Sequence, residues 1–182
     1  HNPLLLYVYR RPEAVAASLE ARNGFPLDYG LALWEYYNRN AIAALADCDY
    51  IAVGYEQFAA NPEMASRQLA SELAGRGFEI GEAVPAHELF DAQLDNSPKT
   101  EAESRISALK TPEQSELEAI CQALVAGDSP SLLPEAITPA PALTTRLFSM
   151  GKAFEHSAQA RQVRTQFDRS EEHTSELQSQ FR

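Results

Sequence analysis

Short apolar runs alternate with stretches of helical periodicity in the first half of the chain. Residues 4–9 (LLLYVY) form a continuous apolar and aromatic run, which is typical of a strand covered on both faces of a parallel sheet. A second run, residues 50–54 within YIAVGY, predicts another strand. Because a helical stretch connects the two runs, we expect a right-handed crossover and parallel neighbours.

Helix start and stop signals flank several of the periodic stretches. Pro12 suits a first helical turn, which needs no N–H from that residue, and Gly24 suits a left-handed cap. Asn61 can cap a helix that begins at Pro62. Thr111 and Gln114 have the spacing of a capping box. We therefore expect helices over residues 13–22, 28–46, 61–74 and 112–126.

The helix expected over residues 28–46 has apolar residues three and four positions apart, which predicts one buried face. Trp34 lies inside this stripe and is expected to be a core anchor. Glu35 and Arg39 are four residues apart. We expect them to form an exposed pair that contributes about 0.2–0.5 kcal/mol.

Composition narrows the class of protein. The formal net charge of −11 argues against nonspecific nucleic-acid binding, which needs a basic face. No apolar run reaches membrane-spanning length. Cys48 and Cys121 have neither metal-ligand spacing nor a disulfide pattern, so we expect no metal, free thiols and a cytoplasmic location. The oligomeric state is not indicated.

The turn after the first strand carries the strongest candidate chemistry. Arg10 and Arg11 follow the strand, where ligands bind in open α/β sheets, and Ser18 lies in the next helix. A guanidinium fork and a short hydroxyl can both contact one phosphate. The pattern Arg10-Arg11-Pro12, Val15 and Ser18 resembles the second cofactor motif of the sulfotransferases. In that family the arginine and the serine hold the 3′-phosphate of 3′-phosphoadenosine 5′-phosphosulfate.

A second motif extends the resemblance at the matching topological place. Tyr55-Glu56-Gln57 and Asn61-Pro62 are similar to the family's strand that ends in Tyr-Glu-Asp before an Asn-Pro helix start, with Gln57 in place of the acid. The resemblance, which is to the bacterial branch of the family, places Tyr55 near the adenosine. The alternative for Tyr55 is a half-buried side chain with its hydroxyl in water.

The resemblance implies an α/β fold: a truncated P-loop-like parallel sheet with flanking helices and a helical C-terminal part. It implies an enzyme that transfers a sulfuryl group from 3′-phosphoadenosine 5′-phosphosulfate to a hydroxyl or amine of a small-molecule or glycan acceptor. The cofactor-binding residues would be Arg10, Ser18, Arg11 and Tyr55. The family's phosphate-binding loop and base would lie upstream of His1, so we name no catalytic residue and expect an inactive fragment.

The chain also divides by composition. The tail resembles the translation of a sequencing-library adapter, because RSEEHTSELQS is encoded codon by codon by such a DNA string. We expect it to be artefactual. The expected segments are a sulfotransferase-like part at 1–98, a helical extension at 99–127, a Pro-rich linker at 128–142, a helix within 143–168 and the tail at 169–182.

Two other hypotheses about the function stay open. One is a P-loop-related kinase or other nucleotide-dependent transferase that uses Arg10 for an ATP phosphate. The other is a helical interaction module in which Arg10 and Ser18 have no binding role. The nucleotide that protects the complete protein from heat would separate the sulfotransferase from the kinase-like enzyme.

Overall fold

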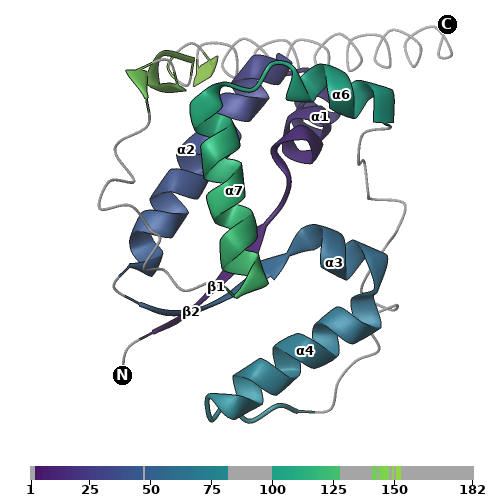
Figure 1. Cartoon of the computed structure of the whole chain (residues 1–182), viewed down its shortest axis with the longest axis vertical. Coiled ribbons are helices and arrows are strands. Elements are labelled where there is room, and N and C mark those ends of the chain that lie inside the picture. The colour runs from purple at the N-terminus through teal and green to yellow at the C-terminus, as the bar shows by residue number, and fades with distance from the viewer. Residues whose placement is uncertain are drawn as a thin grey trace, which may run out of the picture.

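The computed structural model describes residues 3–46, 48–81, 100–127, 141–142, 144–147, 149 and 151–152. This part of the chain is mixed α/β, mostly helical, with a two-stranded parallel sheet (Figure 1). The elements follow in the order β1 (Leu4–Tyr9), α1 (Pro12–Asn23), α2 (Leu27–Leu45), β2 (Asp49–Gly54), α3 (Tyr55–Ala60), α4 (Pro62–Gly75), α6 (Thr100–Ser107) and α7 (Pro112–Ala126).

The two strands are parallel and adjacent, as predicted, and Tyr9 pairs with Gly54 at their carboxyl ends. The expectation that both faces of β1 are covered is wrong. Tyr7 and Tyr9 are buried, whereas Leu6 is 52% and Val8 55% exposed. The reason is that alternate residues of a strand point to opposite faces and only the face of the two tyrosines packs into the main core.

The predicted caps are present. Gly24 takes the left-handed conformation, with φ of 66°, and ends α1. The Asn61 side chain accepts a hydrogen bond from the Met64 N–H at 3.1 Å. Thr111 and Gln114 form both bonds of the capping box at the start of α7. The four expected helices are confirmed to within one residue at each end, while α3 and α6 were not predicted.

One core joins the sheet to α2 and α7, whose ribbons run together on one side of the strands in Figure 1. Apolar burial of this kind is the main favourable term in folding. The expectation that Trp34 anchors the core is confirmed, since this side chain is 3% exposed. The buried members of the cluster are Tyr7, Tyr9, Trp34, Ile42, Leu45, Leu117, Cys121 and Leu124.

Glu35 is buried, which contradicts the expectation of an exposed pair with Arg39. Its side chain is 1% exposed and accepts a hydrogen bond from Arg39 Nε at 2.9 Å. Gln114 Nε2 on α7 donates to it at 3.2 Å, and the Thr144 hydroxyl donates to the same oxygen. The helical pattern placed the pair on one face of α2, but α7 and residue 144 cover that face. Removal of one of these partners would destabilise the fold, because it would leave the buried charge of Glu35 less well compensated.

Several expectations fall wholly or partly outside the described residues. The tail at 169–182 and most of the linker at 128–142 lie there. Of the helix expected within 143–168, residues 144–147, 149 and 151–152 are described, and they are helical. The division at residues 98 and 99 stays a prediction. No helix among the described ranges is both long and apolar enough to cross a membrane.

Candidate anion-binding site at the strand ends

Arg10 and Tyr55 meet at the carboxyl edge of the sheet. Each follows directly on the last pair of the parallel register, Tyr9 with Gly54. The Cζ atom of Arg10 lies 4.3 Å from the centroid of the Tyr55 ring, in the geometry of a cation–π contact. The sequence motifs pointed to both residues separately, and the strand register brings them together.

The turn that carries Arg10 is fixed from behind by α2. The indole N–H of Trp34 donates to the carbonyl oxygen of Arg10 at 2.9 Å. The N–H of Val15 donates to the carbonyl oxygen of Arg11 at 3.1 Å and closes the first bond of α1. The backbone of Arg10 is therefore held by the core, and its guanidinium is held by Tyr55.

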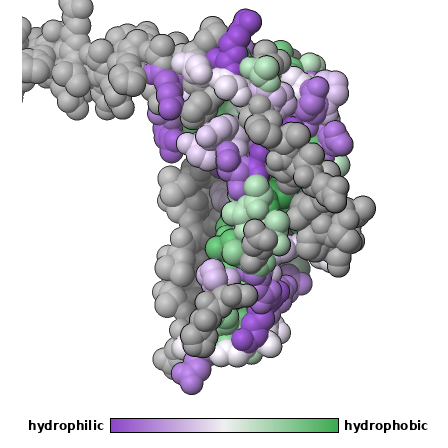
Figure 2. Space-filling model, turned by 90° about the vertical axis from the view of Figure 1, so that its left-hand side faces the viewer, coloured by the Kyte–Doolittle hydropathy of each residue, from purple (hydrophilic) through white to green (hydrophobic). Residues whose placement is uncertain are grey.

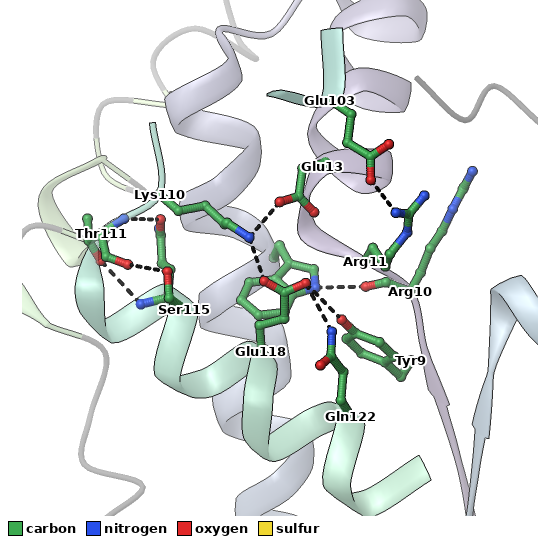
Figure 3. Close-up of polar contacts among 12 residues, drawn as sticks. Tyr9, Arg10, Arg11, Glu13, Glu103, Lys110, Thr111, Ser115, Glu118 and Gln122 are labelled. Carbon is green, nitrogen blue, oxygen red and sulfur yellow. Dashed lines mark hydrogen bonds and ion pairs between the residues drawn. The ribbon is translucent and has the colours of Figure 1, made fainter. Parts of the chain in front are cut away.

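Arg11 faces acidic side chains. Its backbone N–H donates to Glu56 Oε1 at 3.0 Å, and its Nε atom lies 3.6 Å from the same oxygen. Its Nη1 atom donates to Glu103 of α6, which faces Arg11 in Figure 3. The two carboxylates compensate the positive charge of Arg11, which the sequence motif had predicted to bind a phosphate of the cofactor.

Ser18 lies in α1, six residues after Pro12 and therefore about 9 Å further along the helix axis. Its side chain is partly buried, and Ala14, one turn earlier, is fully buried. This places Ser18 beside the packed face of α1. The sharing of one phosphate between Ser18 and Arg10 stays a prediction.

A buried charged cluster that the sequence did not reveal lies next to this turn (Figure 3). Lys110 Nζ lies 2.5 Å from Glu13 Oε1 and 2.5 Å from Glu118 Oε2. The Tyr9 hydroxyl lies 3.5 Å from the other oxygen of Glu118. In the sequence, Glu13 is recognisable only as an acidic residue in the first turn of a helix, where the helix dipole favours a carboxylate. That signal does not predict its ion pair with Lys110, 97 positions away.

Burial and neighbouring charges together shift the pKa values of Glu13, Lys110 and Tyr9. Burial raises the pKa of Glu13, but hydrogen bonds from Lys110 and the backbone outweigh it, so the pKa lies below the ordinary value. Burial lowers the pKa of Lys110, but hydrogen bonds to Glu118 and Glu13 outweigh it, so the pKa lies above the ordinary value. Burial raises the pKa of Tyr9, and the charge of Glu118 adds to the effect. Lys110 and Glu13 are thus kept charged and Tyr9 is kept neutral.

A cleft of about 530 Å³ opens beside the turn, within the usual size range of small-molecule sites. Gly54 lines this cleft, and a Cβ atom at that position would lie 3.4 Å from Val125 Cγ1, an ordinary van der Waals contact. The lining is contributed by β1, β2, α3, α7 and the turn after β1. It consists of Tyr9, Arg11, Gly54, Glu56, Gln57, Gln122, Val125 and Ala126.

Comparisons with protein-family models, with curated proteins and with solved structures found no match to this chain. Among the described residues, no group of three or more histidine, cysteine, aspartate or glutamate side chains is placed to hold a metal ion.

Proposed function

We propose that this chain is the C-terminal part of a P-loop-like sulfotransferase domain and carries the residues that bind the 3′-phosphate of the donor, without the phosphate-binding loop and the catalytic base. The enzyme would transfer a sulfuryl group from 3′-phosphoadenosine 5′-phosphosulfate to a hydroxyl or amine of its acceptor. In this proposal Arg10 binds the 3′-phosphate together with Ser18, and Tyr55 lies beside the adenosine. The remainder of the reaction needs cationic groups and a base that none of these residues supplies.

The observation that supports the proposal best is the contact between Arg10 and Tyr55. The guanidinium stands over the aromatic ring at 4.3 Å, and both residues follow the carboxyl ends of neighbouring parallel strands. This is the edge at which open α/β sheets bind their ligands. An arginine pre-oriented by an aromatic ring and by a backbone bond from Trp34 loses little freedom when it binds a phosphate.

Calorimetric titration with 3′-phosphoadenosine 5′-phosphate tests the proposal. Arg10→Ala should remove a charge-assisted contact of about 1.5–3 kcal/mol, which is roughly a tenfold to more than hundredfold loss of affinity. Ser18→Ala should cost about 1 kcal/mol, because it removes one neutral donor. Arg22→Ala is the matched control, since Arg22 is exposed at the end of α1 and donates only to its neighbour Asn23 among the contacts described.

A second ligand makes the test specific for the 3′-phosphate. Adenosine 5′-phosphosulfate lacks that group, so Arg10→Ala and Ser18→Ala should change its binding much less. Equal losses for both ligands would mean that the substitutions damage the fold and not a 3′-phosphate site. Tighter binding of ATP than of 3′-phosphoadenosine 5′-phosphate by the unsubstituted chain would favour a kinase-like transferase instead.

A further inference from the structure

Arg11 is held by two carboxylates that differ in how firmly they are placed. Glu56 accepts from the backbone N–H of Arg11 and also lies near its Nε atom, so it is tied to the turn itself. Glu103 reaches Arg11 from α6, 92 residues away in sequence, and contacts only the end of the guanidinium. The Arg11 and Glu103 side chains are 34% and 31% exposed, so water and solutes reach this pair.

The packing of α6 does not depend on Glu103. Ile106 of α6 is 1% exposed and packs with Ala16 and Leu31 in a core cluster of its own. Lys110, just after α6, adds the buried ion pair with Glu13. A partly exposed ion pair such as Arg11 with Glu103 contributes little to stability beside such contacts. Glu103 is therefore placed over Arg11 by a helix that other residues hold.

Among the described residues, Arg11 lies beside two carboxylates. Glu56 and Glu103 together carry two negative charges within ion-pair reach of the single positive charge of Arg11. An anion that approaches this edge of the sheet meets an arginine whose donors already face carboxylates. Withdrawal of Glu103 would remove one negative charge from beside Arg11 and make the local potential more favourable for an anion.

We propose that Glu103 is a built-in competitor, an internal anion that occupies the outer face of Arg11 and must be displaced before Arg11 can bind a ligand phosphate. The inference rests on the proposed function, because it concerns access to the same phosphate site. In the chain without ligand, α6 presents Glu103 to Arg11 and lowers anion affinity. When an anion binds at Arg10, Arg11 exchanges Glu103 for the anion, while Glu56 stays on the turn.

Titration of the full chain with 3′-phosphoadenosine 5′-phosphate at low ionic strength tests the inference. Glu103→Gln should bind about twofold to fivefold more tightly than the unsubstituted chain, the range expected when a partly exposed ion pair is relieved. Glu116→Gln, on an exposed position of α7, makes the same change of net charge and should leave affinity unchanged. Glu103→Ala should give the same gain as Glu103→Gln, since alanine favours helix and preserves α6.

A double substitution shows whether the gain passes through Arg11. In an Arg11→Gln background, Glu103→Gln should no longer tighten binding. The inference is overturned if Glu103→Gln binds like Glu116→Gln, if it binds more weakly than the unsubstituted chain, or if its gain persists without Arg11. These outcomes are separable from a failure of the proposed function, in which Arg10→Ala would bind as tightly as Arg22→Ala.

Discussion

The indole N–H of Trp34 donates to the backbone carbonyl of Arg10 at 2.9 Å, and this bond joins the core to the candidate site. Trp34 is 3% exposed and belongs to the main core cluster, whereas Arg10 lies at the carboxyl edge of the sheet. The most buried aromatic residue of α2 thereby sets the position of the turn from which the Arg10 guanidinium extends.

Trp34→Phe should separate the packing of this residue from its hydrogen bond. The phenyl ring keeps much of the apolar contact but leaves the Arg10 carbonyl without the indole donor. We expect a loss of about 1–3 kcal/mol in the free energy of unfolding, measured by urea denaturation. Tyr37→Phe is the control, because Tyr37 is 62% exposed and its substitution should be neutral. Equal stability of the two variants would mean that the bond to Arg10 contributes nothing.

The cluster of Lys110, Glu13 and Glu118 should make stability depend on pH at both extremes. The pKa of Glu13 is lowered by folding, so its contribution is present above the unfolded value of 4.5 and is lost as the pH falls through the lower folded value. The pKa of Lys110 is raised by folding, so its contribution is present below the unfolded value of 10.5 and is lost as the pH rises through the higher folded value.

Glu13→Gln tests the acid side of this dependence. Urea denaturation from about pH 7 to about pH 3 should show a variant that is about 1–3 kcal/mol less stable at neutral pH and loses less on acidification. Glu116→Gln is again the control and should follow the unsubstituted chain. An unchanged acid dependence in Glu13→Gln would rule out its pair with Lys110 as the cause.

The two thiols should differ in reactivity. Burial raises the pKa of the Cys121 thiol to about 11, and its side chain is inaccessible, whereas Cys48 is partly exposed. Only thiolate reacts with disulfide reagents. We expect a thiol-reactive dye at about pH 8 to label Cys48 in the folded chain and to reach Cys121 only in urea. Cys48→Ser should abolish the fast reaction. Equal rates for both thiols without urea would contradict the packing of α7 against β1.

Leu6 and Val8 leave an apolar strip on β1 that invites self-association. They are 52% and 55% exposed. Figure 2 shows one face of the molecule on which apolar side chains lie between hydrophilic regions. We expect the chain to aggregate, and Leu6→Thr combined with Val8→Thr to reduce light scattering. Threonine keeps strand propensity. The free energy of unfolding should change by less than about 0.5 kcal/mol per site, as at other exposed positions.

Leu5→Thr is the matched control on the other face of the same strand. Leu5 is partly buried and packs against the main core cluster, so this substitution should reduce stability without reducing aggregation. The prediction fails if the exposed pair costs as much stability as Leu5, because both faces of β1 would then be covered in solution.

The sequence by itself determined the local elements. The apolar runs of β1 and β2, the cap at Gly24 and the capping box of Thr111 with Gln114 all appear as predicted. Such signals act between residues a few positions apart, where the backbone needs a particular conformation or partner. The same locality explains why α3 was not predicted, because its N-cap residue, Gly54, has no side chain with which to cap the helix.

Only the tertiary structure decided which of these residues meet. The parallel register placed Arg10 over Tyr55, and the packing of α7 buried Glu35, which periodicity alone had put on an exposed face. The contacts of Arg11 with Glu103 and of Lys110 with Glu13 join residues more than ninety positions apart. Charge pairs at that separation leave no periodic trace in the chain, because they follow from how helices pack and not from how each helix forms.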